Sequence, residues 1–299
     1  MKLLITGALS LNDEQLNTIE NMGHEIVYMK NEAESLPCSC LDVEGIICNG
    51  LFLYHPIEKF TSLRYIQLTS AGFDRVPMDF VKQKGIKIFN ARGVYSIPMA
   101  EFALCGVLSL YKKIRFFDKN QKLHRWEKNR ELGELFNKNI LIVGAGNVGQ
   151  ECAKRFLMMG CRVFGADIVS NNSEYFEEIY SMNELHIPLS IADVVILTLP
   201  LTNETKNLFS TDIFSKMKYG AVFVNISRGA IVNTVHLISA LKTKLAGAVL
   251  DVFEEEPLGE NNELWDMDNV IITPHNSFVG EGNNKRLFDL IINNLTKEA

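Results

Sequence analysis

A glycine-rich turn near the middle of the chain constrains its fold more than any other feature. Residues 139–149 read Asn-Ile-Leu-Ile-Val-Gly-Ala-Gly-Asn-Val-Gly, so that an apolar run enters a turn containing three glycines. In this spacing Gly144 permits a tight turn, Gly146 lets a pyrophosphate approach the backbone, and Gly149 lets the helix pack on the strand. The N–H groups at the start of the helix also favour a bound phosphate. The sequence therefore predicts a strand–turn–helix unit that binds a dinucleotide.

The residues after the turn strengthen this prediction. A helical pattern covers 148–159, and an apolar strand over 162–167 ends in Asp167. Asp167 lies 18 residues beyond Gly149 (167 − 149), close to the separation of about 20 expected for a carboxylate that binds the adenosine ribose. Such a carboxylate repels a 2′-phosphate, so NAD is favoured over NADP. The alternative is a glycine turn that binds nothing.

Length and composition indicate the class of protein. A chain of 299 residues is longer than a single hydrophobic core usually supports, which predicts two domains. No apolar run is long enough to span a membrane, and the apolar stretch after Met1 is better interpreted as a first strand than as a signal peptide. With a net charge of −6 and no evident basic run or basic helix face, nucleic acid and membrane are not expected partners.

Cysteine usage favours a reducing cytoplasm and no metal site. Cys38 and Cys40 form the only close pair, and no second pair stands at zinc-ligand spacing. The other four cysteines lie in apolar segments and are expected to fill the core: Cys48, Cys105, Cys152 and Cys161. Trp126 and Trp265 are also expected to be packing residues.

Short apolar runs alternate with amphipathic stretches, a pattern typical of parallel sheets covered by helices. The expected strands are residues 3–5, 25–29, 45–48, 65–68, 86–89, 140–143, 162–167, 194–199, 221–226, 246–252 and 270–273. The expected helices include residues 13–22, 77–84, 148–159 and 285–295, with a long apolar segment over 98–111. We therefore expect an α/β protein of two doubly wound parallel-sheet domains. A Rossmann NAD-binding domain (97–276) would be inserted into a flavodoxin-like substrate domain (1–96 plus 277–299).

Three late strands are followed by side chains suited to acid–base chemistry. Arg228 follows the strand over 221–226, a run of three glutamates follows the next strand, and His275 follows the last. Hydride transfer to a 2-oxo acid needs a proton donor at the carbonyl oxygen, and histidine titrates in the appropriate range. A neighbouring carboxylate would orient the imidazole and favour its protonated form. Arginine can bind the substrate carboxylate through its planar fork.

Over nearly its whole length the chain resembles the D-isomer-specific 2-hydroxyacid dehydrogenases, which include D-lactate, glycerate, 3-phosphoglycerate and formate dehydrogenases. The resemblance rests on the glycine turn at 144–149 and on 199–205 (Leu-Pro-Leu-Thr-Asn-Glu-Thr), 224–230 (Val-Asn-Ile-Ser-Arg-Gly-Ala), 250–257 (Leu-Asp-Val-Phe-Glu-Glu-Glu-Pro) and 273–275 (Thr-Pro-His). It implies that Arg228, Glu256 and His275 are the catalytic residues. The other two glutamates, Glu254 and Glu255, are expected to be solvated loop charges.

The resemblance also implies contacts with cofactor and substrate. Asp251 would hydrogen-bond the nicotinamide carboxamide, and the loop over 70–74 would offer backbone N–H groups to the substrate carboxylate. The implied substrate residues are Ala71, Gly72, Phe73, Arg92, Arg228 and His275. The implied cofactor residues are Gly144, Gly146, Asn147, Val148, Gly149, Asp167, Leu199, Pro200, Thr205, Ile226 and Asp251. A homodimer is implied as well, with contacts over 98–111 and the residues leading to Trp126.

Departures from the family pattern leave the substrate open. Arg92 replaces a common proline, and it either binds a second anionic group or is a surface charge. The loop over 49–55 lacks arginine and carries Phe52 and Tyr54, which favours an unphosphorylated substrate. We therefore expect an NAD-dependent D-2-hydroxyacid dehydrogenase that works as a 2-oxo acid reductase. The alternatives are an activity on a phosphorylated acid, as in 3-phosphoglycerate dehydrogenase, or a non-catalytic NAD(H)-sensing regulator.

Overall fold

The chain forms two compact units, and the second is inserted into the first. In the computed structural model, residues 1–37, 41–168 and 173–297 are described. The first unit contains Met1–Tyr95 and Gly280–Ala299, and the second contains Ser96–Val279. These bounds differ by one and three residues from the expected domain boundaries after residues 96 and 276. Cys38 and Cys40 lie outside the described residues.

The first unit is built on a parallel sheet with the strand order β2-β1-β3-β4-β5. Its strands are β1 (Lys2–Thr6), β2 (Glu25–Met29), β3 (Gly45–Cys48), β4 (Tyr65–Leu68) and β5 (Lys87–Phe89). Helices α1 (Asp13–Asn21) and α9 (Asn283–Thr296) pack on one face, and α2 (Met78–Lys84) packs on the other. The order 2-1-3-4-5 is that of flavodoxin-like sheets, which confirms the expected fold class of this unit.

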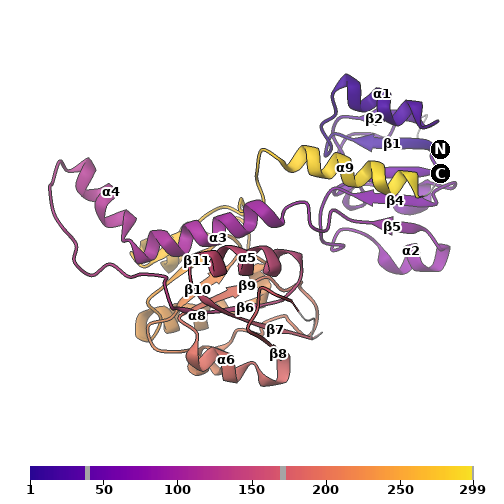
Figure 1. Cartoon of the computed structure of the whole chain (residues 1–299). Helices are drawn as coiled ribbons and strands as arrows, with labels where there is room; N and C mark the ends of the chain where they lie inside the picture. The colour runs from indigo at the N-terminus through magenta and orange to yellow at the C-terminus, as the bar shows by residue number, and fades with distance from the viewer. Residues whose placement is uncertain (38–40, 169–172, 298–299) are drawn as a thin grey trace. The chain divides into compact units, whose positions relative to one another are not determined.

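The second unit is built on a parallel sheet with the order β12-β11-β10-β9-β6-β7-β8 (Figure 1). Its strands are β6 (Asn139–Val143), β7 (Arg162–Asp167), β8 (Glu178–Ser181), β9 (Val194–Leu197), β10 (Val222–Asn225), β11 (Gly247–Leu250) and β12 (Val270–Ile272). The chain runs outward from β6 to β8 on one side and from β9 to β12 on the other. This reversal between β6 and β9 is the switch point of a doubly wound Rossmann sheet, as expected.

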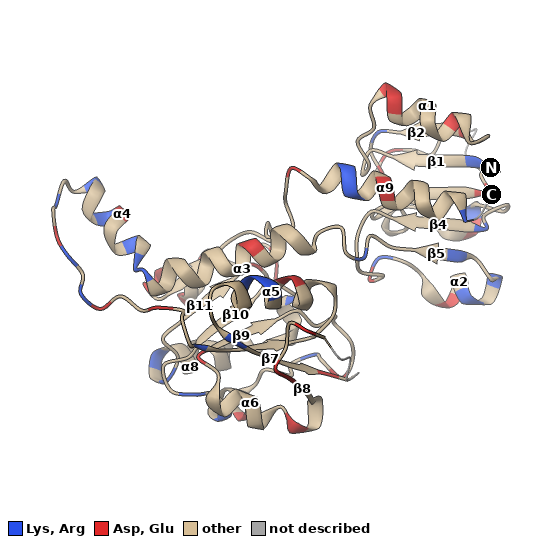
Figure 2. Cartoon of the chain, in the orientation of Figure 1, with Lys and Arg blue, Asp and Glu red and all other residues tan. Residues whose placement is uncertain are grey.

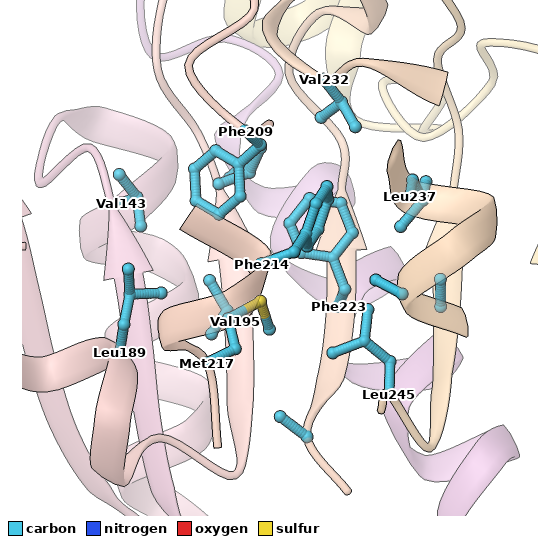
Figure 3. Close-up of a cluster of buried hydrophobic side chains, with 14 of the residues drawn as sticks. Val143, Leu189, Val195, Phe209, Phe214, Met217, Phe223, Val232, Leu237 and Leu245 are labelled. Atoms are coloured by element: carbon cyan, nitrogen blue, oxygen red, sulfur yellow. The ribbon is translucent and has the colours of Figure 1, made fainter. Parts of the chain in front are cut away.

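Helices cover both faces of this second sheet. Helices α3 (Ser96–Tyr111) and α5 (Asn147–Met158) pack on one face, and α6 (His186–Ile191), α7 (Thr211–Lys216) and α8 (Thr234–Thr243) pack on the other. In the core beneath α7, the rings of Phe209, Phe214 and Phe223 lie with centroids 5.3 to 5.9 Å apart (Figure 3). Strand β10 is buried along its length because it has a layer of helices above and below.

Helix α4 (Ile114–Lys122) and the chain that follows it project away from the second sheet (Figure 1). Trp126 is 99% exposed, so the core of this chain does not provide the packing expected for its side chain. Arg115, Lys119 and Lys122 recur at helical spacing and give α4 a short basic face, visible in blue in Figure 2. The sequence pattern gave no sign of this face because the helix itself was not expected.

The cysteines bear out the sequence expectation with one exception. Cys48, Cys152 and Cys161 are buried free thiols, whereas Cys105 is a free thiol on the exposed side of α3. Burial raises the pKa of the Cys152 thiol to about 12 and that of Cys161 to about 11, so both stay protonated at neutral pH. Within the described ranges, no helix is both long and apolar enough to cross a membrane.

Candidate active site

The glycine turn lies at the switch point of the second sheet and leaves the start of α5 open. Gly144 has φ +106°, and a Cβ on it would lie 2.9 Å from the carbonyl carbon of Thr198. A Cβ on Gly149 would lie 2.0 Å from the carbonyl oxygen of Gly144, whereas one on Gly146 would meet no atom within 4 Å. Gly144 and Gly149 are therefore required by packing. The open space at Gly146, beside the first N–H groups of α5, fits a pyrophosphate.

Asp167 lies beside this turn at the end of β7. Its Oδ2 accepts a hydrogen bond from the Ala145 N–H at 2.6 Å, and its Oδ1 accepts one from the Ile168 N–H at 2.7 Å. The carboxylate is thus held at the carboxyl end of β7, next to the glycines. Its role toward the ribose stays a prediction.

The other expected cofactor residues gather along the same edge of the sheet. Asn147 and Val148 begin α5, Leu199 and Pro200 follow β9, and Ile226 follows β10. The hydroxyl of Thr205 donates to the Pro200 carbonyl at 2.7 Å and fixes the loop after β9. A further residue, which the sequence did not indicate, ties the turn to this loop: the Thr198 hydroxyl donates to the Gly144 carbonyl at 2.6 Å.

Arg228 lies in a turn that packs closely against a neighbouring loop. It follows β10, and one of its guanidinium nitrogens donates to the Ser227 carbonyl at 2.8 Å. A Cβ on the next residue, Gly229, would lie 1.8 Å from the carbonyl of Phe253, so this position must be glycine for the loops after β10 and β11 to touch. The contact brings the Arg228 turn against the loop that carries Glu256.

Glu256 and His275 form a hydrogen-bonded pair. His275 Nδ1 lies 2.8 Å from Glu256 Oε2, and the side chains are 41% and 36% exposed. The Phe253 N–H donates to Glu256 Oε1 at 3.0 Å, so both carboxylate oxygens are engaged. Because a carboxylate only accepts hydrogen bonds, Nδ1 carries the proton in this pair. Nε2 is then the nitrogen through which the ring can exchange a proton with a substrate.

Asp251 holds the turn that presents His275. Its side chain is fully buried, and Oδ1 accepts hydrogen bonds from the Thr273 hydroxyl and the Asn276 N–H, each at 2.7 Å. Oδ2 accepts from the Ser277 N–H at 2.9 Å, and the Asp251 carbonyl accepts from the His275 N–H at 2.7 Å. The turn needs this support because His275 has φ +52°, a conformation that costs energy for a residue with a Cβ. The proposed carboxamide contact stays a prediction.

Glu254 also has a structural task that the sequence did not indicate. Its carboxylate accepts a hydrogen bond at 2.6 Å from the N–H of Thr234, the first residue of α8. A carboxylate at a helix N-terminus satisfies an otherwise unpaired donor and interacts favourably with the helix dipole. Glu254 is exposed in the loop after β11, as expected, and it has this structural contact in addition.

The expected substrate residues of the first unit lie in the loops after β4 and β5. The Asn90 side chain donates to the Ala71 carbonyl at 2.6 Å, and the Ser70 hydroxyl donates to the Gly72 carbonyl at 3.2 Å. These bonds engage carbonyl groups of the loop. Phe73 is 38% exposed, and Arg92 is exposed.

The doubly wound sheet with its glycine turn is the fold of a dinucleotide-dependent oxidoreductase. The chain belongs to the D-isomer specific 2-hydroxyacid dehydrogenase family, because the model of that family's NAD-binding domain matches residues 104–277. A hydroxypyruvate reductase of Blautia hydrogenotrophica is 30% identical over 99% of this chain and 96% of its own length. A D-3-phosphoglycerate dehydrogenase of Archaeoglobus fulgidus is 34% identical over 73% of this chain, but over only 42% of its own length.

Solved structures agree with this assignment. A D-isomer specific 2-hydroxyacid dehydrogenase family protein of Aeromonas salmonicida superposes with a TM-score of 0.83 at 28% identity, covering 99% of this chain and 94% of that one. The protein is therefore an NAD-dependent oxidoreductase that acts on the hydroxyl or keto group of 2-hydroxy or 2-oxo acids. The expected family, enzyme class and cofactor are confirmed.

Proposed function

We propose that this enzyme is a 2-oxo acid reductase in which His275 is the acid–base residue. Arg228 binds the substrate carboxylate and polarises the carbonyl, while Glu256 accepts the Nδ1 hydrogen bond of His275 and orients its ring. The backbone N–H groups of Ala71, Gly72 and Phe73 also bind the substrate carboxylate. The observation that carries the proposal is the 2.8 Å bond between His275 Nδ1 and Glu256 Oε2.

The proposed reaction is balanced by one hydride and one proton. NADH, when bound, supplies the hydride to the carbonyl carbon. His275 donates its Nε2 proton to the carbonyl oxygen, which gains negative charge as the C–O double bond becomes single. The product is a 2-hydroxy acid. In the reverse direction the neutral imidazole takes the hydroxyl proton, and Glu256 keeps the Nδ1–H oriented throughout.

The test is NADH consumption at about 340 nm, where reduced nicotinamide absorbs, against small, branched, aromatic, dicarboxylic and phosphorylated 2-oxo acids. NADPH is run in parallel. We expect turnover with at least one unphosphorylated class, and we expect His275→Ala to lower kcat by about 10²–10⁴-fold. NADH binding, followed by nicotinamide fluorescence, should change little in this variant. Unchanged turnover in His275→Ala would refute the assignment.

We also propose that the protein works as a cytoplasmic homodimer. The apolar, exposed residues after α4 favour a partner surface: Leu123 is 50% exposed, Leu132 is 41% exposed and Trp126 is almost fully exposed. A second copy of the chain, meeting α3, α4 and this segment, would bury them. The free thiols at Cys48, Cys152 and Cys161 favour a reducing compartment.

A further inference from the structure

The carboxyl edge of the first sheet carries an anion-binding arrangement at its switch point. In a sheet of order 2-1-3-4-5, ligands bind where the chain reverses, between β1 and β3. Here Thr6 ends β1, and the N–H groups of Asn49 and Gly50 follow β3. A hydroxyl and two successive backbone N–H groups are the donors that bind an anion in such concavities.

The chain fills this arrangement with its own carboxylate. Glu32 Oε1 accepts hydrogen bonds from the Thr6 hydroxyl at 2.6 Å and from the Asn49 N–H at 2.7 Å. Oε2 accepts from the Gly50 N–H at 2.7 Å. The Glu32 carbonyl lies 3.0 Å from His55 Nε2, which anchors the backbone of the same residue. Glu32 is thus fixed at both its side chain and its main chain.

The loop at Ala71–Phe73, which we propose binds the substrate carboxylate, follows the strand next to the one that precedes the Glu32 site. Strands β3 and β4 pair in parallel with Cys48 opposite Leu68, so the loop at Ala71–Phe73 and the loop at Asn49–Gly50 leave the same edge of one sheet. A substituent that extends from a bound 2-oxo acid toward β3 would meet donors that are already taken and a negative charge. The side chain of Arg75 also passes here, with its Cδ 3.7 Å from the Cβ position of Gly50.

We propose that Glu32 determines substrate class: it selects 2-oxo acids whose far end is uncharged and rejects those that carry a second carboxylate or a phosphate. The proposal rests on the 2-oxo acid reductase activity proposed above and deepens it. Replacing Glu32 by glutamine removes the charge and the acceptor at Gly50. The Gly50 N–H and the Arg75 cation then remain as components of a site for the second anionic group.

The experiment compares kcat/KM within two matched substrate pairs, hydroxypyruvate with its 3-phosphate and 2-oxopentanoate with 2-oxoglutarate. The wild type should prefer the uncharged member of each pair by at least about tenfold, since like charges brought together cost more than about 1.4 kcal/mol. Glu32→Gln should reduce this preference by about tenfold or more in both pairs.

Glu44→Gln is the matched control. Glu44 immediately precedes β3, at the opposite edge of the same sheet, where it pairs with Arg64 at 2.8 Å. Like Glu32→Gln, the Glu44→Gln substitution removes one negative charge from the first unit. The substrate preference of this variant should therefore stay at the wild-type value. Thermal unfolding of both variants checks that each is folded.

The outcomes separate the two proposals. If the wild type reduces no 2-oxo acid, the proposed function fails. If it reduces uncharged acids and Glu32→Gln leaves both preferences unchanged, the function stands and the role of Glu32 is wrong. Should Glu32→Gln not fold, the wild type alone decides, because equal kcat/KM for hydroxypyruvate and its 3-phosphate would overturn the proposal.

Discussion

At the scale of single residues, the hydrogen-bonded pair Glu256–His275 is the part of the candidate site that the sequence predicted in most detail. The strand ends indicated an arginine, an acidic cluster and a histidine, and the family pattern selected Glu256 from three adjacent glutamates. The structure brings Glu256 and His275 within hydrogen-bond distance. Spacing alone could not make that selection, because it depends on how the loop after β11 folds back so that Phe253 donates to Glu256.

Glu256→Gln tests the pairing through turnover. The amide keeps one acceptor oxygen for two donors, the His275 Nδ1–H and the Phe253 N–H, so the imidazole loses its fixed orientation. We expect kcat for the preferred 2-oxo acid to fall by about tenfold or more, while the Kd of NADH stays close to wild type. A kcat at the wild-type value would remove Glu256 from this role.

Asp251 shows what sequence reasoning missed at this scale. The family pattern implied a contact with the nicotinamide, but the buried carboxylate also accepts three hydrogen bonds from the His275 turn. The sequence did contain a signal for this role: Asp251 directly follows a fully apolar strand, and a buried carboxylate requires hydrogen-bond donors around it. The sequence could not show which donors the fold brings to it.

Asp251→Asn distinguishes the two roles. The amide keeps one acceptor oxygen, so at least one buried N–H loses its partner, at a cost of about 1–3 kcal/mol. If the turn is the main role, Tm and kcat fall together while the Kd of NADH stays close to wild type. A Kd for NADH that rises strongly at unchanged Tm would instead assign Asp251 to the nicotinamide.

At the scale of elements, the buried strands were predictable and the exposed elements were predicted less completely. Strands β3, β4 and β7 have the expected bounds, because strands buried on both faces are continuous apolar runs. The edge strand β2 also has the expected bounds, although only Met29 is buried in it. Strand β8 was missed: it lies at the sheet edge and has exposed or half-buried residues at all four positions. Helix α4 was missed because its apolar residues, Ile114, Phe116 and Phe117, all lie in its first turn and residues 118–122 are polar, so no apolar repeat continues along the helix.

Gly146→Ala tests whether the glycine turn binds the cofactor. An added Cβ meets no protein atom within 4 Å, so stability should change by less than about 1 kcal/mol. The methyl group would, however, occupy the space expected for the pyrophosphate, and the Kd of NADH should rise by about tenfold or more. Gly259→Ala is the control, since that glycine has equally open surroundings outside the turn. Equal NADH affinity in both variants would place the phosphates elsewhere.

At the scale of the whole molecule, the proposed dimer explains an exposure that the isolated chain does not. Trp126 is 99% exposed, and a large apolar side chain is buried in most proteins by its own core or by a partner. Sequence composition could not distinguish these two possibilities. Trp126 is exposed in the single chain because the segment after α4 leaves the sheet instead of returning to it.

Trp126→Ala should weaken self-association. We expect light scattering after gel filtration to give a dimer for the wild type and a larger monomer fraction for the variant at equal concentration. Tyr219→Ala is the control, because Tyr219 is an aromatic side chain of the same unit that is 80% exposed. A monomeric wild type would contradict the proposed dimer.

The insertion of one unit into the other has a consequence for how such an enzyme can evolve. Arg228, Glu256 and His275 all follow strands of the second sheet, so one continuous stretch of the gene, Ser96–Val279, encodes all three proposed catalytic residues. The proposed selector, Glu32, is encoded in the flanking sequence. Recombination at the two borders would therefore exchange substrate preference and leave the reaction intact. A lineage could acquire new substrates this way without rebuilding its chemistry.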